Sequence, residues 1–330
     1  MPNFLLLQTA FIGDVVLATA LVEKLHRSFP EAEIDFLLRK GNEGLLARHP
    51  HIRRVWVWDK SRGKYRHLWR LLRQIRAERY DGVINLQRFF STGLLTAFSR
   101  GKARVGFDKN PWSFAFDRKV PHRWGTDETP LHEVERNLQL IAEWADDAFE
   151  PPRLYPPEDA LDELEISRPY VCLAPTSVWF TKQWPAGKWV ELLRRLPADH
   201  CVYLLGGPAD HAVCERILQE SGREKGVNLA GRIGLLASAA LMAGAEMNYV
   251  NDSAPLHLAS AMNAPVTAIF CSTVPRFGFG PLSDRSFIAE TAENLPCRPC
   301  GLHGYRACPE GHFRCADIDP EAVLALNSGL

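Results

Sequence analysis

The stretch Ala174–Pro185 combines residue types that suit the binding of phosphate. The apolar segment before it, from Tyr170 to Leu173, is typical of a buried strand. Thr176 and Ser177 then supply hydroxyl and backbone N–H groups that can face an anion, and Lys182 adds a positive charge. The proline that ends the stretch suits the first turn of a helix. The stretch therefore predicts a diphosphate-binding connection between a strand and a helix.

A second stretch, Tyr249–His257, lies about seventy residues further along the chain and also connects a predicted strand to a predicted helix. A strand ends there, the residues from Asn251 to Ser253 are good helix N-caps, and a helix is predicted from about Pro255. Helix N-termini attract anions because their first N–H groups are unpaired and the helix dipole is positive there. We expect two such N-termini to converge on one anionic ligand.

The third candidate is Gly13-Asp14, which follows an apolar segment at the start of the chain. Gly13 has no Cβ, which permits a positive φ or the close approach of another backbone. Asp14 at a helix start has two interpretations. Its carboxylate can accept a proton from an attacking hydroxyl, or it can stabilise the helix as a cap or dipole partner by about 0.5–2 kcal/mol. The residues alone leave both open.

Together these motifs resemble glycosyltransferase family 9, the heptosyltransferases. The resemblance extends from Leu5 to the cysteine-rich tail, with the motifs in the order of the family. It implies a GT-B fold and an inverting, metal-independent transfer of heptose from ADP-heptose to the inner core of bacterial lipopolysaccharide. The sequence Thr-Lys-Gln-Trp-Pro and the C-terminal cysteines are more similar to the second heptosyltransferase than to the first.

The resemblance also implies roles for single residues. Asp14 becomes the general base, and Lys182 offsets the charge of the departing nucleoside diphosphate. Asp210, in the loop that begins Gly206-Gly207, accepts hydrogen bonds from the ribose, and Ile233 contacts the adenine. Ala254 stands where the family more often has glycine, so a Cβ narrows the phosphate approach if the position needs a positive φ. The implied donor-binding residues are Gly13, Thr176, Ser177, Asp210, Ile233, Asp252, Ser253, Ala254, Pro255, Leu256 and His257.

Ordinary structural interpretations remain beside these roles. A lysine at a helix start is often only solvated, and a histidine beside an apolar run, such as His257, is often only packed. Two rival functions also remain: a nucleotide-sugar epimerase of the same fold, and a non-catalytic protein that binds a nucleotide sugar.

The alternation of short strands and helices in both halves of the chain favours two doubly wound parallel sheets. We predict two Rossmann-like α/β domains of the GT-B type that face a central cleft. An N-terminal acceptor-binding domain spans 1–155 and a C-terminal donor-binding domain spans 156–330, joined by the proline-rich segment Glu150–Pro157. The predicted strands are Phe4–Leu7, Ile34–Leu38, Val55–Trp58, Gly82–Leu86, Tyr170–Leu173, Val202–Leu205 and Val266–Phe270. The predicted helices are Val15–Phe29, Tyr65–Glu78, Trp189–Leu196, Ala212–Ser221, Gly234–Ala243 and Leu256–Met262.

The segment from Arg53 to Tyr80 is strongly basic, with ten Arg or Lys against Asp59 and Glu78. Within it, leucine and isoleucine residues at helical spacing place an apolar stripe beneath a basic face. An amphipathic surface helix explains this pattern. We favour capture of an acidic glycolipid acceptor and peripheral membrane contact, and we expect no nucleic-acid partner because no recognition motif is present. The candidate residues are Arg70, Arg73 and Arg76.

Four of the eight cysteines, Cys297, Cys300, Cys308 and Cys315, crowd into nineteen residues near the C-terminus. Their density suits a tetrahedral structural zinc site, although reduced thiols that only pack the tail are the alternative. The remaining four cysteines lie within apolar patterns and are predicted to be core residues.

Composition indicates a globular protein of two ordinary domains, because 46% of its 330 residues are hydrophobic. The formal net charge is zero, so only local charge can argue for a charged partner. The chain starts without a basic signal region, and no apolar run approaches the roughly 18 residues of a membrane span. We therefore expect a cytoplasmic protein, peripheral at the inner face of the inner membrane.

Overall fold

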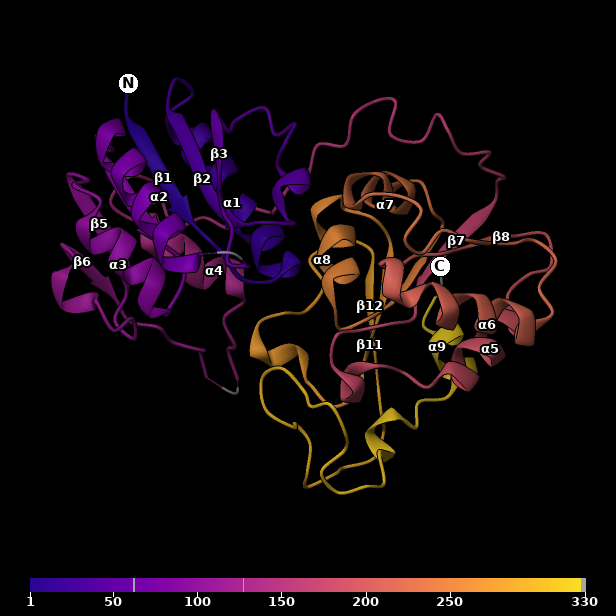
Figure 1. Ribbon diagram of the computed structural model, residues 1–330. Helices are drawn as coiled ribbons and strands as arrows, with labels where there is room; N and C mark the ends of the chain where they lie inside the picture. Colours follow the sequence, from indigo (N-terminus) through magenta and orange to yellow (C-terminus); the bar gives the residue numbers. More distant parts are fainter. Residues whose placement is uncertain (62, 127, 328–330) are drawn as a thin grey trace. The chain divides into compact units, whose positions relative to one another are not determined.

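The computed structural model describes residues 1–61, 63–126 and 128–327 of the chain. Arg62, one of the cations of the basic segment, lies outside the described residues. The chain divides into two compact units, the N-terminal unit Met1–Tyr155 and the C-terminal unit Pro156–Leu330. Each unit is built on its own parallel sheet with helices packed against it (Figure 1).

The N-terminal unit has a six-stranded sheet in the order β3-β2-β1-β4-β5-β6. From β1 the chain moves outward to β3, then crosses to β4 on the other side of β1 and continues to β6. This reversal between β1 and β4 is the switch point of a doubly wound sheet. The strands are β1 (Asn3–Leu7), β2 (Glu33–Arg39), β3 (Arg54–Trp58), β4 (Gly82–Asn85), β5 (Ala103–Phe107) and β6 (Arg118–Val120).

Helices of the N-terminal unit pack in two pairs, α1 with α4 and α2 with α3. This pairing follows from the strand order, because right-handed crossovers that reverse direction place helices on opposite faces of the sheet. The helices are α1 (Ile12–Ser28), α2 (Lys64–Glu78), α3 (Phe90–Phe98) and α4 (Glu133–Leu138). The 3-10 turns are η1 (Glu43–Leu45), η2 (Ser113–Ala115) and η3 (Gln139–Ile141).

The C-terminal unit repeats the plan with the order β12-β11-β10-β7-β8-β9, and its switch point lies between β7 and β10. Its strands are β7 (Tyr170–Ala174), β8 (Cys201–Leu204), β9 (Gly226–Asn228), β10 (Asn248–Asn251), β11 (Val266–Phe270) and β12 (Ser286–Glu290). Its helices are α5 (Ala186–Arg195), α6 (His211–Ser221), α7 (Leu235–Ala243), α8 (Ala254–Ala261) and α9 (Pro320–Ala325). The 3-10 turns are η4 (Phe180–Lys182), η5 (Pro208–Asp210), η6 (Pro275–Phe277) and η7 (Arg314–Ala316).

Each unit has its own apolar core. In the N-terminal unit, Leu5 and Leu7 of β1 are fully buried beneath the apolar stripe of α2. In the C-terminal unit, Trp184 and Trp189 pack edge to face, with ring centroids 5.1 Å apart, inside a core that the tail completes with Cys315 and Val323. Strands buried on both faces read as continuous apolar runs, which is the pattern that the sequence shows. The predicted α/β class with two doubly wound sheets is confirmed.

Among the residues that the structure describes, none of the helices combines the length and apolar character needed to cross a membrane.

Candidate active site

The two predicted phosphate-binding motifs meet at the switch point of the C-terminal unit. Thr176 and Ser177 follow β7, and Asp252 and Ser253 follow β10, which is the neighbouring parallel strand. Their connections touch directly, because the Ser253 hydroxyl lies 3.5 Å from the Thr176 carbonyl oxygen. A second link joins the same loops, since the Asn251 side chain accepts a hydrogen bond of 3.0 Å from the Trp184 N–H. The structure therefore brings the two motifs together where ligands bind in open α/β sheets.

The start of α8 is open to an anion. Ser253 is the N-cap, but its side chain forms no capping bond to its own helix. Pro255 has no N–H group, and the Leu256 N–H bonds to the Ser253 carbonyl at 3.0 Å. The N–H groups of Ser253 and Ala254 are therefore the donors that a phosphate would meet here. Ala254 is the first helical residue and has no positive φ, so the condition under which its Cβ was expected to narrow the phosphate approach is not met.

Helix α5 starts three residues before the helix predicted from Trp189, and Pro185 is its N-cap rather than a first-turn residue. Lys182 ends the short turn η4 that precedes this helix. It is also not simply solvated, because its Nζ forms an ion pair of 2.7 Å with the Asp252 carboxylate, and both side chains are largely buried. The Thr273 hydroxyl donates a 2.6 Å hydrogen bond to the same Asp252 oxygen. Asp252 therefore holds Lys182 at the junction of the two motifs.

His257 lies in α8 and is 5% exposed. Burial lowers its pKa to about 4; the Lys182 charge acts in the same direction and Asp252 opposes it. The imidazole is therefore neutral at neutral pH and brings no charge to a phosphate. Its Nδ1 is buried and has no hydrogen-bond partner among the described residues. A direct contact of His257 with the donor stays a prediction.

The predicted ribose and adenine loops lie side by side. The Gly231 N–H donates a 2.9 Å hydrogen bond to the Gly206 carbonyl, and a Cβ on Gly231 would lie 2.6 Å from the Pro208 Cα. Asp210 ends η5, and one of its carboxylate oxygens accepts a 2.7 Å hydrogen bond from the Gly207 N–H. Through this bond Asp210 stabilises the turn of its own loop. Ile233 is half-buried in the second loop, just before α7.

The cysteine-rich tail supports the loop that carries Lys182. Thr181 is buried, and its hydroxyl oxygen accepts hydrogen bonds from the Tyr305 N–H at 2.7 Å and from the Ser272 hydroxyl at 3.0 Å. The Cys300 N–H bonds to the Ser272 carbonyl at 2.9 Å. Arg298 donates to the carbonyl oxygens of residues 270, 271 and 273, which lie at and beyond the end of β11. Arg298, Cys300 and Tyr305 of the tail thus hold the segments beside Lys182 in place, and we call them the tail clamp. The sequence analysis missed this role of the tail.

The structure does not support the predicted zinc site. Over residues 1–61, 63–126 and 128–327, no group of three or more His, Cys, Asp or Glu side chains is placed to hold a metal ion. All eight cysteines are free thiols. Cys315 is buried in the core, and Cys297 packs against that core. Burial, together with the nearby thiols of Cys300, Cys308 and Cys297, raises the pKa of Cys315 to about 11. Packing accounts for Cys315 and Cys297.

At the switch point of the N-terminal unit, Gly13 and Asp14 lie inside α1, which begins three residues earlier than the helix predicted from Val15. Gly13 is buried and has no positive φ, so a left-handed turn does not account for it. Asp14, half-buried, is the acidic residue of the first helical turn. This position suits both a dipole partner and a carboxylate presented at the carboxyl edge of the sheet.

Polar side chains that the sequence analysis missed surround the end of β1. Gln87, which follows β4, accepts hydrogen bonds from the Thr9 N–H at 3.1 Å and the Thr9 hydroxyl at 2.9 Å. Lys60 reaches across from the loop after β3 and donates to the Thr9 carbonyl oxygen at 3.0 Å. Burial, together with Arg39 and Lys64, lowers the pKa of Lys60. The positions of Thr9 and Gln87 just after predicted strands were the signal in the sequence that could have identified them. This edge of the sheet is electropositive and suits an acidic ligand.

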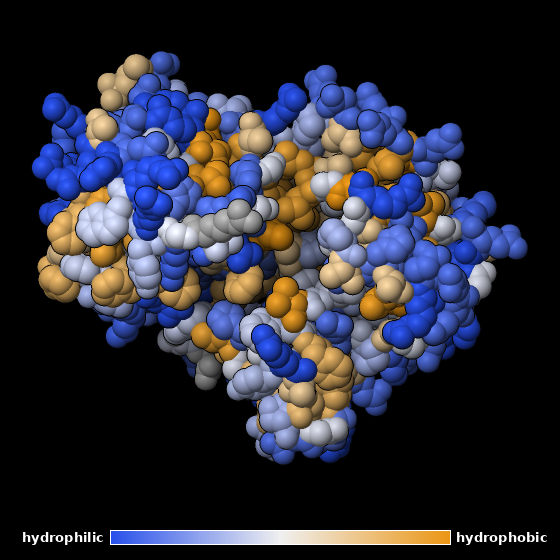
Figure 2. Space-filling model, in the orientation of Figure 1, coloured by the Kyte–Doolittle hydropathy of each residue, from blue (hydrophilic) through white to orange (hydrophobic). Residues whose placement is uncertain are grey.

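The basic segment is only partly available to a ligand. Arg53 pairs with Asp35 and Glu78, and Arg54 pairs with Glu78, so these cations stabilise the fold. On α2, four apolar side chains at positions 68, 71, 72 and 75 are buried, as the spacing predicted. Among the described residues, no carboxylate pairs with Arg70, Arg73 or Arg76. Figure 2 shows strongly hydrophilic atoms gathered in this region of the N-terminal unit.

Two doubly wound α/β units, with the two candidate phosphate motifs adjacent at one switch point, fit a glycosyltransferase of the GT-B class that uses a nucleotide sugar. The model of glycosyltransferase family 9 (heptosyltransferase) matches residues 68–304, and the chain belongs to this family.

Related proteins match over most of their length. Lipopolysaccharide heptosyltransferase 3 of Escherichia coli is 27% identical over 80% of this chain and 82% of its own. Lipopolysaccharide heptosyltransferase 1 of Pseudomonas aeruginosa is 27% identical over 90% of this chain and 85% of its own. The structure of Escherichia coli ADP-heptose lps heptosyltransferase II has a TM-score of 0.79 and 24% identity, with coverage of 99% of this chain and 97% of that chain. These values do not single out one branch of the family.

Proposed function

We propose that the protein transfers heptose from ADP-heptose to the inner core of lipopolysaccharide, with inversion at the transferred carbon. The supporting observation is the pair of motifs after β7 and β10, joined by the ion pair of Lys182 with Asp252. Membership of the heptosyltransferase family and the names of the relatives supply the sugar, the nucleotide and the acceptor.

In this proposal the C-terminal unit holds the donor. The diphosphate meets the hydroxyl groups of Thr176 and Ser177 and the N–H groups at the start of α8. Lys182 offsets the charge that accumulates on the departing ADP, so a protein cation does the work that a metal ion does in other enzymes. The loops with Asp210 and Ile233 border the ribose and the adenine.

The N-terminal unit acts on the acceptor. Asp14 accepts the proton of the acceptor hydroxyl as it attacks the sugar carbon, and ADP leaves from the opposite face. One direct displacement inverts the configuration without a covalent intermediate. Arg70, Arg73 and Arg76 attract the phosphorylated acceptor and bring the enzyme into peripheral contact with the inner face of the inner membrane.

Product analysis tests this function. The enzyme is incubated with ADP-heptose or other nucleotide sugars, with truncated lipopolysaccharide cores, and with or without EDTA. We expect one added heptose by mass only with ADP-heptose and a heptose-free inner core, at an unchanged rate in EDTA. The anomeric configuration of the product, read by NMR, must be opposite to that of the donor. Isomerised donor formed without acceptor would favour the epimerase, and binding without turnover would favour a non-catalytic protein.

A further inference from the structure

A patch of exposed aromatic side chains covers the N-terminal ends of α2 and α3. Six of the nine exposed large apolar side chains described in the N-terminal unit gather here. They include Tyr65, Trp69 and Phe90, which are 70%, 57% and 59% exposed. We call this patch the aromatic surface; its residues are Tyr65, Trp69, Phe89, Phe90, Phe98, Trp112 and Phe114.

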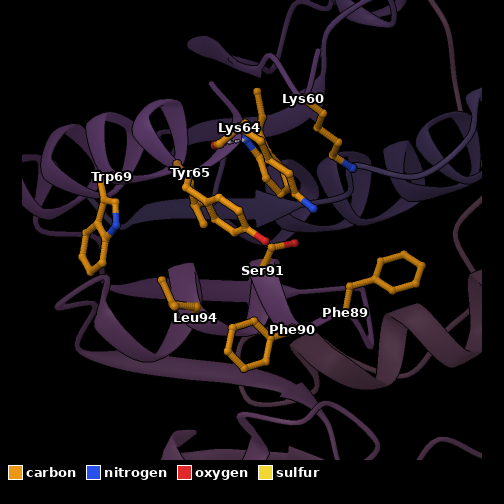
Figure 3. A pocket seen from close by; sticks show the side chains of 10 residues that line it. Lys60, Lys64, Tyr65, Trp69, Phe89, Phe90, Ser91 and Leu94 are labelled. Carbon is orange, nitrogen blue, oxygen red and sulfur yellow. Dashed lines mark hydrogen bonds between the residues drawn. The ribbon is translucent and has the colours of Figure 1, made fainter. Parts of the chain in front are cut away.

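A pocket of about 610 Å³ lies at the centre of this surface, between the two helices. Figure 3 shows Tyr65 and Trp69 projecting from α2 over Ser91 and Leu94 of α3, with Lys60 and Lys64 at the upper rim. Its lining is mainly aromatic and aliphatic, and its two lysines are the charged members.

Ring contacts extend the surface beyond the pocket. Phe90, on the pocket rim, lies 5.4 Å from Trp112 between ring centroids, and Trp112 contacts Phe98 at 5.4 Å and Phe114 at 5.7 Å. Phe114, in η2, is 74% exposed. The aromatic surface therefore continues from the pocket rim through Trp112 to Phe98 and Phe114, which argues for an extended partner.

The charge beside this surface has one sign. From Lys60 to Ala77 the chain contains Lys and Arg but neither Asp nor Glu. On α2, Tyr65, Trp69, Arg73 and Arg76 follow a spacing of four, four and three residues, which places them along one flank of the helix. Two exposed aromatic side chains are thus followed by two cations on a single strip of the helix.

We infer that the aromatic surface docks the enzyme on an anionic lipid bilayer, with the rings of Tyr65, Trp69 and Phe90 in the headgroup layer. Tyrosine and tryptophan favour the membrane interface because one end is polar and the rest apolar. Adjacent cations on an apolar face strengthen binding to anionic lipids, by roughly fivefold per cation. The inference deepens the membrane contact proposed above by naming the residues that enter the bilayer.

Vesicle binding of the full-length protein tests the inference without any reaction. The probes are vesicles of phosphatidylethanolamine with phosphatidylglycerol and cardiolipin, compared with phosphatidylcholine alone. The double variant Trp69→Gln/Phe90→Gln should bind the anionic vesicles roughly tenfold or more weakly than the parent, because it removes interfacial apolar area. Phe149→Gln, which changes an exposed aromatic residue outside the surface, should bind like the parent.

Lipids brominated on the acyl chain give a second readout. They should quench the tryptophan fluorescence of the parent, and Trp69→Phe should lose much of this quenching while it still binds. Equal binding of the double variant and the parent, or equal binding of the parent to both vesicle types, overturns the inference.

Two soluble assays separate this inference from the proposed function. ADP binding checks that every variant is folded. Transfer to a deacylated core saccharide should proceed at the parental rate in the double variant, because that acceptor needs no bilayer. A selective loss of this transfer would instead assign the pocket to the saccharide and overturn the membrane assignment. Failure of the parent to transfer heptose at all would sink the proposed function and leave the vesicle result standing.

Discussion

A substitution at Asp14 can distinguish a role in proton transfer from a role in helix stability. Asp14→Asn keeps the shape of the side chain but removes the proton acceptor, so we expect transfer to fall roughly 10²–10⁴-fold with little loss of donor affinity. Steady-state rates and ADP-heptose binding by calorimetry measure the two effects. Thermal unfolding is the control, because a mere dipole partner at the first turn of α1 would change stability and leave the rate near that of the parent.

Lys182 should act more strongly on the departing ADP than on the bound donor. Lys182→Ala removes the charge at the junction of the two motifs, and we expect kcat to fall roughly 10²–10³-fold with a smaller loss of ADP affinity. The substitution also leaves the buried Asp252 without its ion-pair partner. Lys182→Arg retains a cation and serves as the matched control. Parental kinetics in Lys182→Ala would place this lysine outside the site.

His257 predicts a pH dependence of stability. In the unfolded chain its imidazole takes up a proton near pH 6.5. In the folded protein the pKa of His257 is lowered to about 4, so the unfolded state gains the proton first as the pH falls. The free energy of unfolding should therefore drop between about pH 6.5 and pH 4, by up to about 3 kcal/mol from this residue.

The difference between parent and His257→Asn isolates this effect. Chemical denaturation at pH 7 and at pH 4.5 should show that the advantage of the parent shrinks at the lower pH. His122, whose pKa is also lowered to about 4, is present in both proteins and cancels in the difference. The same difference at both pH values would contradict the burial that we assign to a neutral His257.

Among the elements, the tail clamp sets the position of the Lys182 loop. Gly304 has a φ of +73°, and a Cβ there would lie 2.9 Å from the Thr181 Oγ1 and 3.0 Å from the Lys182 Cγ. Gly304→Ala should therefore destabilise the protein by about 1–3 kcal/mol and lower turnover.

Gly311 offers a matched control for the clamp. Its φ is also +73°, but nothing lies within 4 Å of a Cβ built on it. Gly311→Ala should thus carry the same backbone strain without pressing on Lys182, and its kcat should stay near the parental value. Equal kcat values in the two variants would mean that the tail does not position Lys182.

The sequence predicted the elements with strong apolar periodicity and missed the short or half-exposed ones. β11 agrees with its prediction to the residue, because Val266–Phe270 is apolar apart from Thr267. β9 has three residues and β12 is partly exposed, so neither carries a clear apolar pattern. α3 was missed because Thr92 and Thr96 lie on its buried side, where their hydroxyls bond to backbone carbonyls.

The same limit applies to the candidate site. The motifs after β7 and β10 could be read from local residue types at two strand ends. The ion pair of Lys182 with Asp252 could not, because seventy residues separate the partners and only strand order makes them neighbours. The link from Thr181 to Tyr305 spans 124 residues and depends on the path of an irregular tail. Contacts between residues so far apart leave no periodic pattern in the sequence from which they could be predicted.

At the scale of the whole molecule, two units with separate sheets and cores allow acceptor and donor binding to be changed separately. Arg70, Arg73 and Arg76 lie in the N-terminal unit, and the paired phosphate motifs lie in the C-terminal unit. Changing the three arginines to Gln should raise the acceptor KM several-fold and leave the ADP dissociation constant unchanged.

The dependence of the acceptor KM on salt concentration independently tests whether the three arginines act on acceptor binding alone. Exposed charges are screened over about 10 Å at 0.1 M salt, so added salt should raise the parental acceptor KM toward that of the triple variant while the variant responds little. A matched triple variant, with Arg194, Arg195 and Arg216 of α5 and α6 changed to Gln, removes the same charge from the C-terminal unit. It should keep the acceptor KM and the salt response of the parent. If both triple variants behaved alike, net charge rather than the basic face of α2 would govern acceptor use.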